Sequence, residues 1–238
     1  MPRQYEFAVA LQDTDYTSKI KLVSLTDKIL AAAGLDADAL GFGVGELNRG
    51  ACTWVLSRFA LQMSRMPRAG EKLCVTTWVS EYGRMLTTRN FKIAAEQGEA
   101  LGAAVSAWVM LDIGKRTPVD LSRLDDAVKH MEPIPCPIEG PRRLRAADIP
   151  IIKRHDTVYS DMDFNGHVGT MRYMEMMIDA LPLSVVENVE ALRFDINFLR
   201  ETRAGKTIDI GMSESEGRFG FRLAVGDEDI CRAELNPA

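Results

Sequence analysis

Three short polar side chains, Asp163, Asn165 and His167, stand at alternate positions just before an apolar stretch of helical period. This arrangement favours a corner between a strand and a helix over a core strand or a solvated loop. An imidazole can transfer a proton, an amide can bind a carbonyl oxygen or a water, and a carboxylate can orient either group. The three residue types together indicate the chemistry of acyl transfer.

Length and composition restrict the class of protein that carries this corner. The chain has 238 residues, of which 46% are hydrophobic and 26% charged, as in ordinary globular proteins, and it is long enough for two domains. No apolar run reaches the roughly 18 residues of a membrane span, and the first residues lack the apolar core of a signal peptide. We therefore expect a cytoplasmic protein. The net charge of −5 argues against a general nucleic-acid binder.

Metal and disulfide chemistry is not indicated by the cysteines and histidines. The cysteines are scattered without a C-x-x-C pair, which favours reduced core residues over a disulfide framework or a zinc knuckle. They are Cys52, Cys74, Cys136 and Cys231. The pair His155-Asp156 resembles part of a metal-phosphohydrolase site, but the other ligands of such a site are missing at suitable positions. With three histidines in the chain, a three-His zinc site would need all of them, so we expect no metal.

The sequence repeats itself. Segment 12–20 aligns with segment 160–168 through an Asp-x-Asp-aromatic pattern, at an offset of 148 residues (163 − 15). Further on, Arg-Ala-Gly recurs at 68–70 and 203–205, at an offset of 135 residues (203 − 68), which fits a shortened loop in the second copy. Self-similarity over this length is typical of duplicated domains rather than of a solenoid.

Each copy contains one apolar stretch of helical period followed by a series of period-two stretches. The helical stretches run over 21–33 and 168–181, with Gly34 and Pro182 as expected stops. The period-two stretches, rich in β-branched and aromatic residues, predict strands. They cover 72–80, 85–94 and 103–112 in the first copy, and 208–215, 219–225 and 230–235 in the second.

This order of elements predicts an α+β fold in which each copy wraps a curved antiparallel sheet around one long buried helix. Segment 131–141 contains four prolines in eleven residues and cannot form a helix or a central strand. We therefore expect an N-terminal domain at 1–130, a linker at 131–150 and a C-terminal domain at 151–238.

With these residues identified, the chain resembles the acyl-ACP thioesterase family of the bacterial type, which has two hotdog domains in tandem. The family shows an Asp, an Asn and a His at the spacing of 163, 165 and 167, before the long helix that contains Tyr173. Segment 197–201 matches the setting of the family's catalytic Glu, which falls on Glu201. Plant members place a Cys directly after this Glu. Here the position is Thr202, which argues against a cysteine nucleophile.

The resemblance implies hydrolysis of fatty acyl-acyl carrier protein to free fatty acid and carrier, the step that ends fatty-acid synthesis, without a cofactor. It implies that Glu201 is the base that activates water. Asn165 then binds the carbonyl or the water, His167 donates to the oxyanion or to the leaving thiolate, and Asp163 orients its neighbours. The division of these roles stays open.

The first copy has Thr17 and Lys19 where the second has Asn165 and His167, so it lacks the catalytic set. The resemblance implies that this copy shapes the pocket for the acyl chain. Candidates for the pocket wall, each of which can equally be plain core, are Trp54, Leu56, Phe59, Trp78 and Met85.

A cluster of cations near the end of the linker is a candidate docking region for the acidic acyl carrier protein. It consists of Arg142, Arg143, Arg145, Lys153 and Arg154. An acyl-CoA thioesterase of the same fold, a hotdog dehydratase and a non-hydrolytic acyl-binding module are alternative functions. A monomeric pseudodimer and a homodimer both fit a tandem fusion.

Overall fold

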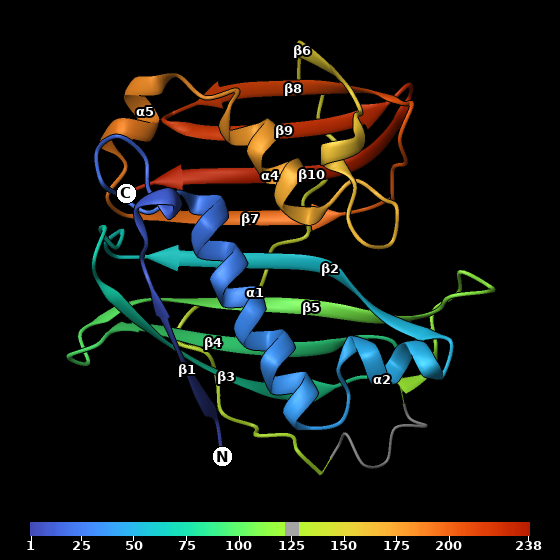
Figure 1. Ribbon diagram of the computed structural model, residues 1–238. Helices are drawn as coiled ribbons and strands as arrows, with labels where there is room; N and C mark the ends of the chain where they lie inside the picture. Colours follow the sequence, from blue (N-terminus) through green and yellow to red (C-terminus); the bar gives the residue numbers. More distant parts are fainter. Residues whose placement is uncertain (122–128) are drawn as a thin grey trace. The chain divides into compact units, whose positions relative to one another are not determined.

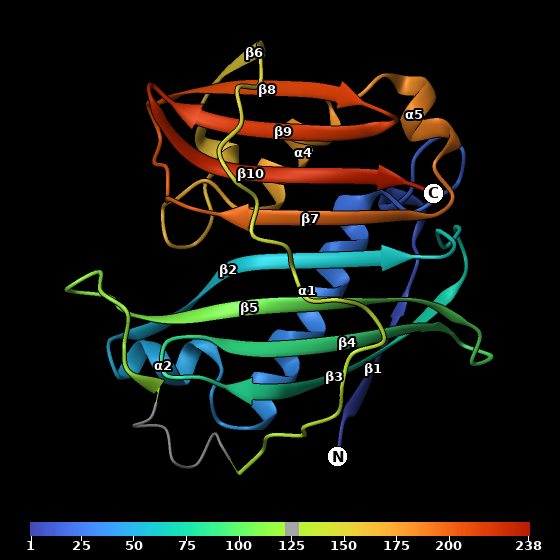
Figure 2. The ribbon, with the colours of Figure 1, turned by 180° about the vertical axis from the view of Figure 1, so that it is seen from behind.

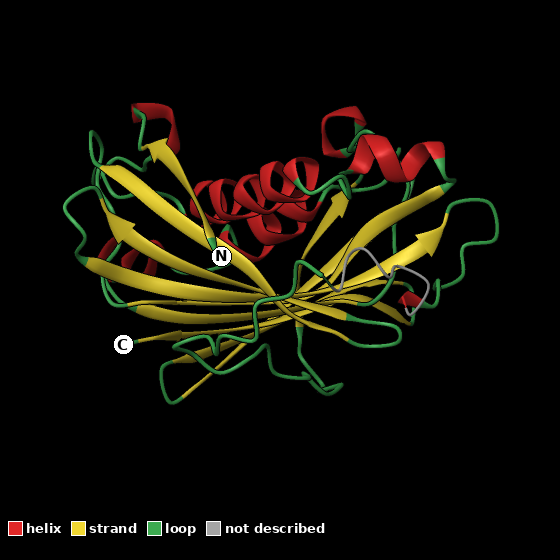
Figure 3. Ribbon diagram, turned by 90° about the horizontal axis from the view of Figure 1, so that it is seen from below, coloured by secondary structure: helices red, strands yellow, loops and turns green. Residues whose placement is uncertain are grey.

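The computed structural model describes residues 1–121 and 129–238. The chain forms two compact units, residues 1–141 and 142–238. Each unit has a sheet with its helices on one face (Figure 3). None of the helices in the described part of the chain is long and apolar enough to cross a membrane.

The first unit contains a five-stranded antiparallel sheet crossed on one face by a long helix, α1 (Figure 1). Its strands, in spatial order, are β1 (Arg3–Ala8), β3 (Lys72–Tyr82), β4 (Thr87–Ala95), β5 (Ala100–Asp112) and β2 (Cys52–Met63). Its helices are the 3-10 turn η1 (Leu11–Asp13), α1 (Leu22–Ala39) and α2 (Val44–Arg49). The fully buried Leu25 and Ile29 of α1, together with Phe59 and Phe91 of the sheet, belong to the core.

The second unit repeats this topology with shorter helices. Its strands, in the corresponding order, are β6 (Ile151–Asp156), β8 (Thr207–Ser215), β9 (Arg218–Val225), β10 (Glu228–Pro237) and β7 (Leu192–Phe198). Its helices are η3 (Tyr159–Asp161), α4 (Thr170–Ile178) and α5 (Leu183–Asn188). Met174 and Met177 of α4 are fully buried, as are Phe194 and Phe221 of the sheet.

The duplication is visible in the backbone, because an offset of 148 residues superimposes the starts of successive elements. It relates β1 to β6 (3 and 151), η1 to η3 (11 and 159) and α1 to α4 (22 and 170). The loops between η and α also match. Ser18 has φ 67° and Gly166 has φ 73°, while Thr14 bridges Ile20 as Met162 bridges Val168.

Both helix ends differ from the prediction. Helix α1 continues through the exposed Gly34 to Ala39. An internal glycine costs about 1 kcal/mol, and here a buried contact beyond it, between Asp36 Oδ2 and Arg89 Nη1 at 2.6 Å, favours the longer helix. In the second unit α4 ends at Ile178, so a single long helix is wrong there, and Pro182 is the N-cap of α5.

The six expected strands are present, each extended by a few residues or shifted at an end. Four further strands, β1, β2, β6 and β7, were not indicated by the period-two pattern. Together they provide the outer strands of each five-stranded set, and β6 and β7 lie next to the segments that carry the polar corner and Glu201.

Residues 131–150 form neither helix nor strand. In the second unit the part that precedes β6 runs along the sheet face opposite α4 (Figure 2). Asn197 holds it there, since its Oδ1 accepts the Leu144 N–H and its Nδ2 donates to the Arg142 carbonyl, both at 2.9 Å. In the first unit the indole of Trp78 donates to the Ile134 carbonyl at 2.8 Å.

Candidate active site

The loop between η3 and α4 is closed by the side chain of Asp163. Its Oδ1 accepts the backbone N–H of Asn165 at 2.8 Å and that of His167 at 3.1 Å. The Asp163 N–H in turn donates to the His167 carbonyl at 2.7 Å, and Gly166 supplies the left-handed residue of the turn. Asp163 therefore orients Asn165 and His167 through their backbone amides.

Two further hydrogen bonds fix the far end of this loop. The Val168 N–H donates to the Thr202 carbonyl at 2.7 Å, and the Gly169 N–H donates to the Asp161 carbonyl at 2.9 Å. The first bond brings the segment after β7, which contains Glu201, against the loop. Gly169 is the N-cap of α4, so Asn165 does not serve as its cap.

His167 and Glu201 face each other. His167 Nε2 lies 3.4 Å from Glu201 Oε2, and the side chains are 11% and 36% exposed, respectively. A half-exposed carboxylate beside a largely buried imidazole can exchange protons with a substrate or a water at the rim. Asn165, two residues before His167 on the same loop, is exposed to solvent. The structure thus brings His167 and Glu201 together, and Asn165 lies exposed on the same loop.

A second titratable cluster, which the sequence analysis did not identify, lies where the loop begins. Asp161 is buried and accepts the Val158 N–H at 2.8 Å, His155 Nε2 at 2.7 Å and Arg172 Nε at 3.0 Å. Burial alone would raise the pKa of Asp161, but these three hydrogen bonds outweigh burial, and the pKa is lowered from its ordinary value. The signal that could have found the cluster is the repeat, because His155 stands where the first copy has Phe7 (155 − 148).

The buried thiol and phenol near this region are not suited to proton transfer at neutral pH. Burial raises the pKa of the Cys231 thiol well above its ordinary value. Burial also raises the pKa of Tyr173 to about 12, with Thr202 acting in the opposite direction. Both groups therefore stay protonated. Among the described residues there is no cluster of three or more His, Cys, Asp or Glu side chains that could hold a metal ion.

The five candidate wall residues of the first unit lie on both faces of its sheet and in one loop. Strand pairing puts Val79, Arg89, Ser106 and Phe59 in one row, so the neighbouring Trp78 lies on the opposite face of the sheet from Phe59. Trp54 and Leu56 share the face of Phe59, because their partners Met110 and Trp108 alternate with Ser106 along β5. Met85 lies in the loop between β3 and β4. Trp54 packs against the cluster of Leu47, Met110 and Leu121, Leu56 is buried on β2, and Met85 is 40% exposed.

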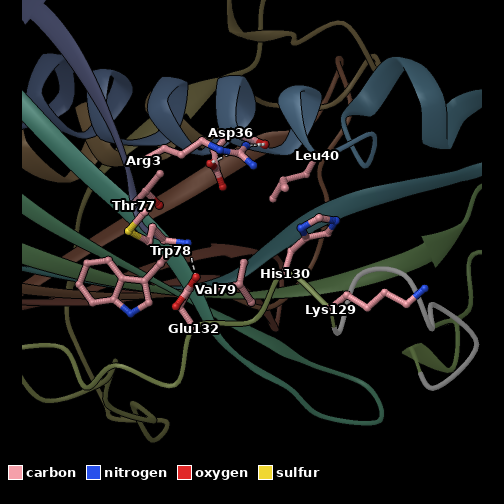
Figure 4. A pocket seen from close by; sticks show the side chains of 10 residues that line it. Arg3, Asp36, Leu40, Thr77, Trp78, Val79, Lys129, His130 and Glu132 are labelled. Carbon is pink, nitrogen blue, oxygen red and sulfur yellow. Dashed lines mark hydrogen bonds and ion pairs between the residues drawn. The ribbon is translucent and has the colours of Figure 1, made fainter.

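A cavity of about 130 Å³ in the first unit, partly open to solvent, is lined largely by polar side chains (Figure 4). Arg3 and Asp36 point toward each other in it, with Arg3 Nη1 3.2 Å from Asp36 Oδ1. Asp36 also binds Arg89 and accepts a hydrogen bond from the Tyr5 hydroxyl at 3.4 Å. Such a lining does not match an apolar slot for an acyl chain.

The five candidate docking cations are all exposed, but two of them are engaged. Arg142 Nη1 lies 3.0 Å from Glu234 Oε1, and Arg154 Nε lies 2.8 Å from Asp209 Oδ1. Lys153 and Arg154 are neighbours on β6, so the pleat directs them to opposite faces. The other two, Arg143 and Arg145, lie in the segment that follows the sheet face opposite α4.

Comparison with known proteins agrees with the fold. The acyl-ACP thioesterase N-terminal domain model matches residues 3–130, and the C-terminal domain model matches residues 145–236. The crystal structure of an acyl-ACP thioesterase from Bacteroides thetaiotaomicron is 31% identical and superimposes with a TM-score of 0.91, covering 99% of this chain and 97% of its own.

More distant relatives come from plants. The chloroplastic acyl-[acyl-carrier-protein] hydrolase FATB3 of Cuphea viscosissima is 29% identical over 197 residues, 76% of this chain and 46% of its own. The chain spans about half the length of the curated relatives it matches. The 12:0-ACP thioesterase from Umbellularia californica is 18% identical and superimposes with a TM-score of 0.85, covering 99% of this chain and 96% of its own, which shows the shared fold. The predicted α+β fold with tandem hotdog domains is confirmed, and the chain belongs to the acyl-ACP thioesterase family.

Proposed function

We propose that the chain hydrolyses the thioester of fatty acyl-acyl carrier protein to free fatty acid and carrier, and so ends fatty-acid synthesis. The observation that carries the proposal is the pair of His167 and Glu201, with 3.4 Å between Nε2 and Oε2, on a loop that also carries the exposed Asn165. Membership of the family supports the substrate class, because relatives are named as hydrolases of acyl-[acyl-carrier-protein].

In the proposed reaction, water adds to the thioester carbonyl carbon and the carbon–sulfur bond then breaks. The water supplies the hydroxyl of the fatty acid and the proton of the released thiol. Glu201 removes or orients the proton of the attacking water. The amide of Asn165 binds the carbonyl or the water, and His167 donates to the oxyanion or to the departing thiolate. Asp163 supports both through the loop backbone.

Turnover of an acyl-ACP panel by the wild type, by Glu201→Gln and by Glu228→Gln tests the proposal. Glu228 is a matched control, since it is a neighbouring exposed carboxylate that pairs with Arg200. We expect Glu201→Gln to lower kcat by about 10²-fold or more, the range of general-base catalysis, and Glu228→Gln to leave it unchanged. Undiminished turnover in Glu201→Gln would remove Glu201 from the mechanism.

The carrier is tested with matched acyl chains on acyl carrier protein and on coenzyme A. Higher kcat/KM on the protein carrier is expected, and the reverse would favour an acyl-CoA thioesterase. Binding of acyl-ACP by the wild type without turnover of either substrate would instead identify a non-hydrolytic acyl-binding module.

The proposed carrier-docking region rests on the exposed Arg143 and Arg145. Arg142 and Arg154 carry less of the proposal, because each binds a carboxylate of the same unit. Changing Arg143 and Arg145 to Glu should raise KM for acyl-ACP at low salt, and the effect should fade at high salt. KM for the uncharged acyl-pantetheine should stay constant. Equal KM values for acyl-ACP in wild type and variant at low salt would dismiss this docking region.

The first unit is proposed to shape the acyl pocket, since it has Thr17 and Lys19 in place of the polar pair and therefore lacks the catalytic set. The chain-length profile of Leu56→Ala and Met85→Ala tests this, with the exposed helical Leu35→Ala as the control. Profiles identical to the wild type would mean that these residues do not line the pocket.

Assembly and compartment are also proposals. A monomeric pseudodimer or a homodimer is expected from the tandem fusion, and light scattering of the purified chain decides between them. The free thiol of Cys52, which is partly exposed, fits the reducing bacterial cytoplasm. Cell fractionation that located the protein outside the cytoplasm would correct this expectation.

A further inference from the structure

Asp161 is a buried carboxylate held from three sides, and the mechanism proposed above does not use it. Its side chain has no exposed surface. Oδ2 receives the Val158 N–H and faces His155 Nε2, while Oδ1 receives Arg172 Nε. A buried charge is costly unless it is paired and hydrogen-bonded, so this arrangement restricts both the rotation and the position of the carboxylate.

The three partners come from different elements. His155 is on β6, Val158 precedes η3, and Arg172 lies in the first turn of α4. The Asp161 carbonyl also accepts the N–H of Gly169, at the other end of the loop that carries His167. Asp161 therefore ties the strand and the helix to the root of this loop.

The first unit provides an internal comparison at the same backbone position. There Asp13 Oδ2 accepts the Ala10 N–H at 2.9 Å and lies 2.8 Å from Lys28 Nζ. The positions equivalent to His155 and Arg172 are Phe7 and Ser24 (155 − 148 and 172 − 148). In the first unit, which lacks the equivalents of Asn165 and His167, the flexible ammonium of Lys28 pairs with the carboxylate. In the second unit the planar side chains of His155 and Arg172, whose donor geometry is fixed, bind Asp161 instead.

We propose that His155, acting through Asp161, is a positioning residue for thioester hydrolysis. The inference rests on the proposed function. Donation from His155 fixes Oδ2 of Asp161, and the fixed carboxylate holds the loop root so that His167 stays opposite Glu201. A misplacement of about 1 Å can lower turnover by about 10²-fold, so the reaction needs this support even though His155 touches no reacting atom.

The test compares His155→Phe, the residue type of the first copy, with His155→Gln, whose amide can still donate to Asp161. We expect His155→Phe to lower kcat by about tenfold with KM within about twofold, the pattern for lost transition-state support rather than lost binding. His155→Gln should recover most of the kcat. Asp13→Asn, which alters the equivalent carboxylate in the first unit, should leave kcat unchanged.

A readout without substrate keeps the inference separate from the proposed function. The His167 imidazole is observed by ¹⁵N NMR, and in His155→Phe its resonances should shift from their wild-type positions while those of His130 stay in place. If the wild type hydrolyses no acyl carrier, the proposed function fails, and this shift still supports the coupling. Unchanged His167 resonances would overturn the inference. Wild-type kcat in His155→Phe, or equal losses in His155→Gln and His155→Phe, would overturn it as well.

Discussion

Replacing Asp36 by Asn should destabilise the first unit strongly, because it leaves a buried guanidinium without its charged partner. The side chains of Asp36 and Arg89 are 5% and 8% exposed, and Nη1 lies 2.6 Å from Oδ2. Removing one member of a buried ion pair costs about 3 to 5 kcal/mol of unfolding free energy. Asn keeps an acceptor oxygen, and Arg89 keeps the hydroxyl of Thr77 at 3.3 Å. The expected loss is therefore at the lower end, about 3 kcal/mol.

Urea unfolding followed by tryptophan fluorescence measures this loss in the full chain. All three tryptophans, Trp54, Trp78 and Trp108, lie in the first unit, so their signal reports on the unit that contains the pair. Glu96→Gln is the matched control. It breaks the ion pair between Lys72 and Glu96, whose side chains are 54% and 57% exposed, respectively. Solvent weakens an ion pair at such exposed positions. We expect its unfolding midpoint to stay close to that of the wild type.

A double-mutant cycle distinguishes an unpaired charge from a general packing defect. Arg89→Met alone leaves Asp36 with the weaker contacts of Arg3 and Tyr5. The double variant has neither buried charge, so it should be more stable than the sum of the single losses predicts, by about 1 kcal/mol or more. If Asp36→Asn lost less than about 1 kcal/mol and the cycle showed no coupling, the pair would not act as a buried ion pair.

Four further outcomes are expected. Phe221→Ala should destabilise the second unit by about 3 to 5 kcal/mol in a urea titration followed by circular dichroism, because the ring is fully enclosed. The pKa of Asp161 is lowered in the folded chain, so the ionised carboxylate stabilises the fold above its unfolded pKa, and this stabilisation is lost as the pH falls through the folded pKa. The free energy of unfolding of the wild type should therefore fall more than that of Asp161→Asn between about pH 5 and pH 3. Gly166→Ala should cost about 1 kcal/mol at φ 73°, whereas Ser18→Gly, at φ 67° in the matching loop, should raise the midpoint of thermal unfolding. Iodoacetamide should leave turnover unchanged, because the Cys231 thiol is buried and protonated, and inactivation would point to a nucleophilic cysteine.

The polar corner and the repeat could be predicted because both are properties of residue type and spacing. Asn165 and His167 stand out from the first copy at a fixed offset, and the loop that carries them has the same backbone bridge in both units. The approach of Glu201 to His167 could be inferred only from the family resemblance. It depends on one backbone hydrogen bond, from Val168 to Thr202, which side-chain patterns do not encode.

Other features depend on tertiary contacts that outweigh local preference. Gly34 does not end α1, since the buried contact of Asp36 lies beyond it. Strand β6 is the outer strand of its set and is mostly exposed, so the sequence Ile-Ile-Lys-Arg-His-Asp shows no alternation of polar and apolar residues. Phe59 and Trp78 lie on opposite faces of their sheet, and residue type alone does not reveal which face of a strand a side chain occupies.

The loop of the first unit that matches the site loop of the second has the same backbone conformation but different side chains. The Ile20 N–H donates to the Pro67 carbonyl at 2.8 Å, as the Val168 N–H donates to the Thr202 carbonyl, so the two offsets, 148 and 135, converge on the same junction. Asn165, His167 and Glu201 then correspond to positions 17, 19 and 66, occupied by Thr, Lys and Met. At this junction three side chains, rather than a backbone rearrangement, distinguish the two copies. Substitutions at positions 17, 19 and 66 would therefore place the same three residue types on an equivalent backbone in the first unit.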